Sequence, residues 1–354
     1  ASSQAVYHDR RMRQDRGIFF QEEVTVGENL YAAFSMRGDV SSTMGDTEAR
    51  EWYPKAAVSY QLGEVSVFDN LKLRGAYGQT GNMPQTKAKY TTLSSSNIGG
   101  INGLVPSSTL GNPDIKPERT TELEFGADFS VMGGLATVEA TLYQQSIEDL
   151  ILLVDEAPSS GASNSWQNGG EMETNGLELA LGLNPTSLID LGGLDWNMHM
   201  TYYTNESEVT KLTVDPYNYG GFATFLGTYR IEEGWSPTAI VGADYDADGN
   251  HIELGNENPD FRLSFRNSLS FGPLSLSFLI DHKEGGHAIN LANLIYDLGA
   301  TTADYEENGS RTAVLGGGST APYVESTTYT ALRALSLTYL VPADLTEGYG
   351  LSNV

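Results

Sequence analysis

Apolar and polar residues alternate along most of this chain. The clearest example runs from Thr121 to Phe129, where apolar residues occupy every second position and glutamate, aspartate or glycine stands between them. Successive side chains of a β-strand point to opposite faces, so the pattern predicts a strand with one apolar and one polar face. The same alternation recurs at 177–183, 196–202, 261–266 and 335–339. The spacing of an amphipathic helix is not sustained anywhere, which predicts an all-β chain.

The segments that link the predicted strands alternate in length. Short links carry turn residues, as at 26–28, 132–134 and 272–273, whereas long links run near 80–119, 152–170, 213–258 and 285–330. Short turns on one side and long loops on the other are typical of an antiparallel, up-and-down transmembrane β-barrel with long extracellular loops. The eleven predicted strands lie near residues 17–25, 29–38, 52–62, 70–79, 120–130, 135–151, 171–183, 195–212, 259–270, 274–284 and 331–341.

The number of strands suggests a partial barrel. A soluble β-sandwich also alternates apolar and polar residues, but Greek-key sandwiches do not sort their connections by length. Bacterial single-chain barrels have even numbers of strands, and an open sheet would leave unpaired backbone groups in hydrocarbon. We therefore expect the chain to be part of a larger barrel. Its first ten residues lack the apolar segment of a signal peptide, as expected of a mature or partial chain.

Composition narrows the function classes. The 354 residues include no cysteine, which is compatible with export to an oxidising compartment. With 46 acidic and 20 basic residues the net charge is −26, opposite in sign to what a nucleic-acid binder needs. The sequence holds no Gly-x-Ser-x-Gly, His-Glu-x-x-His or P-loop motif, and its five histidines are scattered. We predict neither nucleic-acid binding nor enzymatic activity.

Several motifs carry information in combination. Residues 71–82 end in Tyr-Gly-Gln-Thr-Gly-Asn, and residues 111–122 contain Asn-Pro-Asp-Ile-Lys-Pro-Glu. Both resemble motifs of the SusC/RagA family of TonB-dependent transporters. Further motifs similar to those of the family, in the family's order, stand at 168–178, 255–256, 259–261 and 329–342.

This resemblance implies a barrel of about 22 strands that encloses a plug. Residues 1–354 would form its C-terminal portion, without the plug domain and the final strands. It also implies a multi-pass protein in contact with lipid, in the outer membrane of a Gram-negative bacterium of the Bacteroidota. The implied function is import of oligosaccharides or oligopeptides, energised through the TonB complex and assisted by a SusD-like surface lipoprotein.

Other functions stay open at this point. A siderophore or cobalamin receptor would share the barrel, although so acidic a chain attracts anionic iron chelates poorly. A secreted carbohydrate-binding β-protein would be soluble without detergent. A structural or adhesive surface protein would show binding at the cell surface without transport of a nutrient.

The two strand faces predict where side chains lie. Apolar faces should meet lipid, and the polar faces should line the lumen or contact a plug, with Glu122, Glu124, Asp128, Arg262 and Arg266 among them. Tyrosines near strand ends are candidates for an interfacial girdle, although aromatic residues favour strands in general. The tyrosine candidates are Tyr31, Tyr60, Tyr143, Tyr202 and Tyr339.

Candidate binding residues gather in the long loops. Aromatic faces are platforms for sugar rings and peptide side chains, although they also pack loops against themselves or a partner. The candidates are Trp166, Tyr217, Tyr219, Phe222, Phe225, Tyr229 and Trp235.

One loop segment has the spacing of a calcium site. Asp244, Asp246, Asp248 and Asn250 follow the Asp-x-Asp-x-Asp-Gly pattern, in which alternating oxygens converge on one cation. The twelfth position, a glutamate in a complete EF-hand loop, is Gly255 here. A structural calcium ion is therefore one hypothesis and an acidic surface turn the other, and no further cofactor is predicted.

Overall fold

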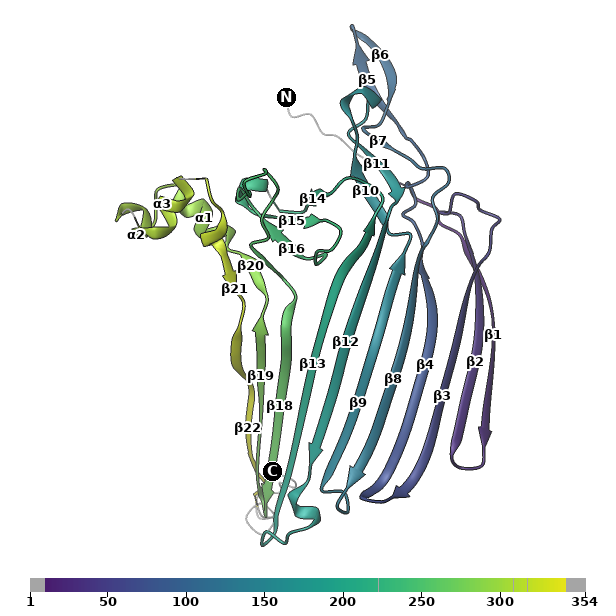
Figure 1. Cartoon of the computed structure of the whole chain (residues 1–354), viewed down its shortest axis with the longest axis vertical. Coiled ribbons are helices and arrows are strands. Elements are labelled where there is room, and N and C mark those ends of the chain that lie inside the picture. Colours follow the sequence, from purple (N-terminus) through teal and green to yellow (C-terminus); the bar gives the residue numbers. More distant parts are fainter. Residues whose placement is uncertain (1–9, 222, 308, 317, 342–354) are drawn as a thin grey trace, which may run out of the picture.

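The computed structural model describes residues 10–221, 223–307, 309–316 and 318–341. Its main body is an antiparallel sheet of eleven strands, each hydrogen-bonded to the next in chain order (Figure 1). This confirms the predicted number and order of the principal strands. They are β1 (Asp15–Val26), β2 (Leu30–Ser41), β3 (Glu51–Val65), β4 (Phe68–Asn82), β8 (Glu118–Val131), β9 (Ala136–Glu148), β12 (Gly170–Leu183), β13 (Leu194–Leu212), β18 (Pro259–Phe271), β19 (Leu274–Gly285) and β22 (Tyr329–Tyr339).

The strand register gathers apolar residues on one face, which we call the outer face. Phe125 stands opposite Leu142, and Leu142 stands opposite Leu177. Such cross-strand neighbours pack against each other and stabilise the sheet. No protein layer covers them, since Phe125 is 59% exposed and Leu142 is 60% exposed. An apolar surface of this extent is unusual on a soluble monomer and fits contact with lipid.

The opposite face, which we call the inner face, is polar. The sheet curls (Figure 1), and residues of this face line two hollows. Glu122, Glu124, Asp128, Arg262 and Arg266 all belong to it, which confirms the predicted grouping. A row of directly opposed residues crosses it in the order Arg74, Gly126, Thr141, Glu178, Tyr203 and Arg262.

The prediction of an aromatic girdle is wrong for two of the five tyrosines. Tyr60, Tyr202 and Tyr339 lie on the outer face, opposite Leu73, Leu263 and Leu274 respectively. Tyr31 and Tyr143 lie on the inner face instead, because they share the strand parity of the polar residues. The parity of a position within its strand, and not its residue type, decides which face it joins.

The short and the long links between strands lie at opposite ends of the sheet. Short turns join β1 to β2, β3 to β4, β8 to β9 and β18 to β19 at one end, and the four longest links lie at the other (Figure 1). In the turn between β8 and β9, Gly133 and Gly134 have φ of +64° and +83°. Glycine adopts this left-handed region without a steric penalty, which permits the tight reversal.

The long links contain secondary structure that the sequence pattern did not predict. The fold is mostly β as predicted, and the link between β19 and β22 adds three short helices, α1 (Leu291–Leu298), α2 (Ala303–Glu306) and α3 (Ser310–Gly316). The longest, α1, has eight residues, too few to repeat a helical spacing. The side chain of Asn290 caps it by accepting a hydrogen bond from the Asn293 amide at 3.0 Å.

Short strands and 3₁₀ turns complete the loops. The strands are β5 (Leu93–Ile98), β6 (Ile101–Pro106), β7 (Thr109–Leu110), β10 (Ile151–Asp155), β11 (Asn164–Asn168), β14 (Tyr217–Tyr219), β15 (Thr228–Ile231), β16 (Ala239–Val241), β17 (Gly255–Asn256), β20 (His287–Ile289) and β21 (Val324–Ser326). The 3₁₀ turns are η1 (Pro158–Ser160), η2 (Pro185–Ser187), η3 (Thr224–Leu226) and η4 (Ala321–Tyr323).

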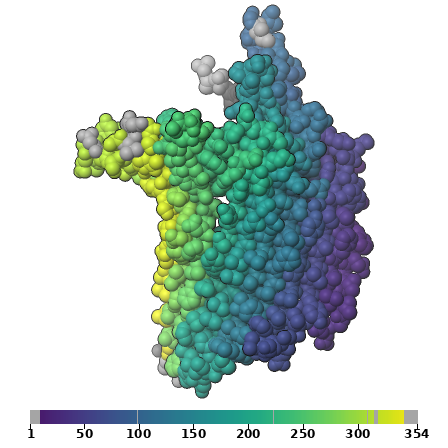
Figure 2. Space-filling model, viewed as in Figure 1, coloured from purple at the N-terminus to yellow at the C-terminus, as the bar shows by residue number. Residues whose placement is uncertain are grey.

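A small apolar core lies in these loops. Leu226, Leu294 and Tyr323 form a buried cluster that joins the link after β13 to the link after β19. Thr320 Oγ1 also donates a hydrogen bond to the Phe225 carbonyl oxygen at 2.9 Å. The two links therefore form one unit, whose helices overhang the barrel wall on the side of β22 (Figure 2). Among the described residues, no helix is long and apolar enough to cross a membrane.

Candidate functional site

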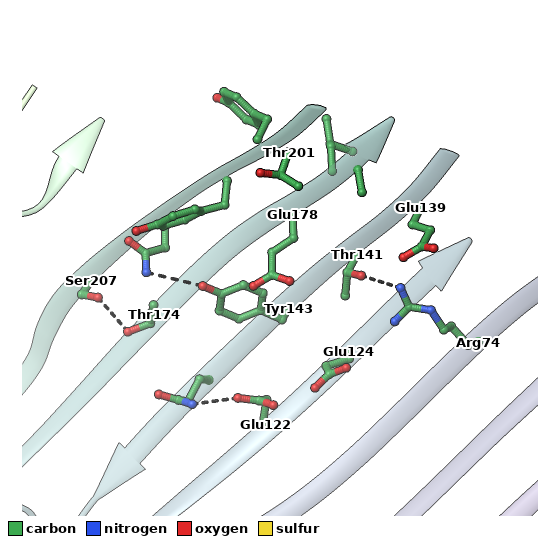
Figure 3. Close-up of a pocket in the computed structure, with 16 residues that line it drawn as sticks. Arg74, Glu122, Glu124, Glu139, Thr141, Tyr143, Thr174, Glu178, Thr201 and Ser207 are labelled. Carbon is green, nitrogen blue, oxygen red and sulfur yellow. Dashed lines mark hydrogen bonds between the residues drawn. The ribbon is translucent and has the colours of Figure 1, made fainter. Parts of the chain in front are cut away.

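One hollow of the inner face has a volume of about 820 Å³. It lies where β4, β8, β9, β12 and β13 run side by side, so alternate residues of five strands point into it (Figure 3). Its charged lining residues are Arg74, Glu122, Glu124, Glu139 and Glu178.

Two hydrogen bonds hold Arg74, the cationic side chain in the lining of this hollow, at one side of it. Arg74 Nη2 donates to Thr141 Oγ1 at 2.6 Å (Figure 3), and its Nε donates to Asp128 at 3.2 Å. Of the four glutamates, Glu122 accepts a hydrogen bond from Gln145 at 2.7 Å. Four carboxylates around one arginine give the hollow a negative potential, which favours cationic groups and hydrogen-bond donors. The arrangement is suited to holding a polar surface and contains no paired nucleophile and base.

Glu122 and Glu124 are thus brought into one site with two glutamates that the sequence analysis did not single out. Glu139 and Glu178 have the same strand parity as the neighbouring polar residues, so the alternation alone could have found them. Arg262 and Arg266 share the inner face but stand farther along the sheet, on β18. Which glutamates meet depends on the register between strands, which the pattern within one strand does not report.

The loop aromatics form more than one group. Tyr219 and Tyr229 stack across β14 and β15, with ring centroids 5.4 Å apart. Tyr229 donates to Glu257 at 2.9 Å, and burial together with this bond raises the pKa of Tyr229 to about 12. Tyr219 donates to the Pro237 carbonyl oxygen at 2.9 Å. Both hydroxyl groups are therefore engaged within the loop, which favours a packing role for these two rings.

The other candidates lie apart from this stack. Burial raises the pKa of Tyr217, which stands on β14 with its ring half-buried. Phe225 is 54% exposed on η3, and Trp235 lines a separate acidic hollow. Trp166, on β11, lines a third hollow together with Tyr90. Phe222 lies outside the described residues.

The four predicted calcium ligands do not converge. Asp244 accepts hydrogen bonds from Ser319 and from the Thr320 amide, the latter at 2.8 Å. Its carboxylate therefore faces the link between β19 and β22, which we call the helical loop. Asp246 accepts from the side chain and backbone of Asn250 within its own turn, which lowers the pKa of Asp246. Among the described residues, no group of three or more acidic, histidine or cysteine side chains is arranged to hold a metal ion. This geometry favours the acidic turn.

Comparison with known proteins identifies the architecture. Residues 2–278 match the sequence profile of the family described as TonB dependent receptor-like, beta-barrel. The TonB-dependent receptor P26 of Formosa agariphila is 27% identical over 378 residues, covering 90% of this chain and 38% of the receptor. The TonB-dependent receptor SusC of Bacteroides thetaiotaomicron is also 27% identical, over 51% of this chain and 19% of SusC.

The fold is shared with a solved transporter. The structure of the RagAB peptide transporter superposes with a TM-score of 0.76 over 96% of this chain, at 20% identity, and 42% of that chain is covered. At this identity the likeness concerns the fold alone. The chain spans about two fifths of the length of the Formosa receptor and of the superposed chain.

Proposed function

The chain belongs to the TonB-dependent receptor-like β-barrel family, and we propose that it forms part of the barrel wall of an importer driven through TonB. It is accordingly an outer-membrane protein of a Gram-negative bacterium. A family of receptors and transporters agrees with the prediction that the chain is not an enzyme.

One observation carries the proposal most strongly. The eleven-stranded sheet has an apolar outer face, a polar inner face and all of its longest links at one end. Each feature has a separate role in an outer-membrane barrel: contact with lipid, a polar lumen, and extracellular loops. Within this proposal, residues 1–354 form the C-terminal barrel portion, and the acidic hollow around Glu124 and Glu178 faces a plug domain. Cationic groups on the plug would compensate these carboxylates.

The proposed cargo is an oligosaccharide or an oligopeptide, which enters through the long loops. Exposed aromatic residues in these loops, such as Phe225 and Tyr90, offer flat apolar faces for either class. The solved RagAB complex is described as a peptide importer, which supports the peptide class by analogy of fold.

We also propose a SusD-like lipoprotein as partner. Ile295, Tyr296 and Leu298 are between 48% and 59% exposed on α1, at the loop end of the barrel. Apolar surface of this kind outside the lipid region suits a protein partner. The partner would be detected by native mass spectrometry of the receptor extracted from its own membrane, as a stoichiometric lipid-anchored subunit.

A transport assay tests the function. Cells with and without the intact gene are given fluorescently labelled oligosaccharides and oligopeptides, in strains with and without a working TonB complex. We expect uptake of at least one class to require both the gene and TonB. Uptake that continues without TonB, or a receptor that remains monomeric and soluble without detergent, would contradict the proposal.

A further inference from the structure

We propose that a basic hollow among the loops binds acidic oligosaccharides, through the carboxylate or sulfate groups that the sugar rings carry. The hollow measures about 630 Å³ and lies between the segment before β1, the link from β4 to β8 and the link from β9 to β12. The inference rests on the proposed import function and specifies its substrate class.

Charge sets this hollow apart from the rest of the chain. Among the residues that the structure describes, its lining includes Arg11, Arg13 and Lys87 and no aspartate or glutamate. The acidic loop hollow beside Trp235 shows the opposite composition, with four carboxylates and, in the described part of the chain, no lysine or arginine. In a protein with a net charge of −26, an anionic ligand is repelled by most of the surface. A local group of cations is where such a ligand gains attraction.

Two cations of the hollow, Lys87 and Arg13, are accessible to a ligand. Lys87 is exposed and is in no ion pair among the residues that the structure describes. Arg13 Nε contacts Asp15 at 2.8 Å, but both side chains are about half exposed. Exposed pairs of this kind are weak, so an incoming carboxylate or sulfate group can compete with Asp15. Guanidinium groups bind such oxyanions through two parallel hydrogen bonds.

Two aromatic residues, Tyr90 and Trp166, line the hollow, and we call the surface that they form its floor. Tyr90 is 59% exposed, and Trp166 pairs across β11 and β10 with Leu153, which is 42% exposed. Flat aromatic faces support the apolar faces of sugar rings. Lys89 Nζ lies 5.1 Å from the centroid of the Tyr90 ring, which adds a further positive charge beside the floor.

The walls are held in place before any ligand arrives. Lys89 Nζ donates to the Met44 carbonyl oxygen at 3.0 Å, and the Asn112 amide donates to the Ala88 carbonyl oxygen at 2.8 Å. Ala88 is completely buried. Preorganised walls lower the entropic cost of binding, which is a general feature of specific ligand sites.

The polar side chains of the lining favour a saccharide over an acidic peptide. β11, which carries Trp166, is hydrogen-bonded to both β10 and β7. A peptide that binds as an added strand could therefore pair only with the outer edge of β10 or β7. Besides Met83 and Pro84, the rest of the lining carries hydroxyl and amide groups, which match the hydroxyl groups of sugars: Gln85, Thr86, Thr92, Ser107 and Thr109.

Calorimetry of the receptor purified in detergent from its complete gene tests the inference. The probes are tetragalacturonate, the neutral maltotetraose and a tetraglutamate peptide. We expect tetragalacturonate to bind at least tenfold more tightly than the other two, with an affinity that falls as salt is raised. Lys87→Gln and Tyr90→Ala should each weaken it about tenfold. Lys211→Gln is the matched control, since Lys211 is an exposed lysine paired with Glu171 outside the hollow.

Each other outcome overturns the inference. Equal binding of maltotetraose removes the role of charge, and tighter binding of tetraglutamate assigns the hollow to peptides. If Lys87→Gln and Lys211→Gln weaken the binding of tetragalacturonate equally, or if tetragalacturonate does not bind at all, the basic hollow is not its binding site. Uptake assays keep the two proposals distinct: TonB-dependent uptake of a neutral sugar or peptide, without affinity for tetragalacturonate, leaves the import function standing and refutes this substrate class.

Discussion

The carboxylate of Asp297 and the guanidinium of Arg311 form a two-point ion pair inside the helical loop. Arg311 Nε donates to Oδ2 at 2.8 Å and Nη2 donates to Oδ1 at 3.1 Å. The Asp297 side chain is fully buried, and it also accepts from the Tyr323 hydroxyl at 2.9 Å and from Thr302. One carboxylate thereby ties α1 to α3, η4 and the turn before α2.

Arg311→Ala should open this loop, because it leaves a buried charge without its main partner. The expected loss is about 3 kcal/mol, or roughly a hundredfold faster amide exchange in α1 and η4. Hydrogen exchange followed by mass spectrometry measures it. Arg333→Ala is the control, because Arg333 is 52% exposed in its pair with Asp281, and the expected cost is below about 1 kcal/mol. Equal effects of both variants would refute the assignment.

The same cluster predicts a window of pH stability for the loop. Hydrogen bonds from Arg311 hold the pKa of Asp297 well below its usual range. A depressed pKa stabilises the folded loop above the unfolded value of about 3.9, and this stabilisation is lost as the pH falls below it. Burial and the bond to Asp297 raise the pKa of Tyr323 to about 12. The stabilisation that Tyr323 gives the folded loop is present below pH of about 10. It is lost as the pH rises towards the raised pKa that Tyr323 has in the folded state.

Proteolysis of the loop as a function of pH checks this prediction. We expect resistance from about pH 4 to about pH 10 and increasing cleavage outside those limits. Tyr323→Phe removes the group that titrates at high pH, so cleavage of this variant above pH of about 10 should rise less steeply. A flat profile below pH of about 4 in the unaltered receptor would show that Asp297 does not govern the loop.

The two faces of β9 predict opposite responses to a new charge. Leu142→Arg places a cation on the outer face, midway along the strand, and should destabilise the receptor in lipid vesicles by about 2–4 kcal/mol. Tyr143→Arg, one residue away, points to the inner face directly opposite Glu124 and should be tolerated. Urea unfolding in vesicles compares the two. Similar losses would mean that the outer face does not meet lipid.

Gly111 lies at a position in the loops where a larger side chain does not fit. A Cβ atom at this position would lie 2.2 Å from the Tyr90 carbonyl carbon, which is backbone and cannot rotate away. Gly111→Ala should therefore cost about 1–3 kcal/mol and displace the segment that carries Tyr90. Thermal unfolding and tyrosine accessibility measure it. Gly78→Ala is the control, since its added atom meets nothing closer than 3.9 Å. An unchanged Tyr90 environment in Gly111→Ala would contradict the packing.

Some features of the loops could be predicted from the sequence, and others could not. The Asp-x-Asp-x-Asp-Gly spacing at 244–249 was visible, yet Asp244 is drawn to Ser319 and Thr320, more than seventy residues away. Trp166 stood out as a loop aromatic, but nothing in the sequence linked it to Arg11, Lys87 or Tyr90. α1 was missed because eight residues cannot display a repeating helical pattern.

The sequence by itself determined the strands, their two faces and the ends at which the chain turns. Residues 121–129 show why, since a period of two is a local property that each strand carries without its neighbours. Only the tertiary structure decided which glutamates share the inner hollow, how Asp297 meets Arg311, and which loops enclose the basic hollow. These contacts join distant residues, and they depend on strand register and loop packing, which no local pattern encodes.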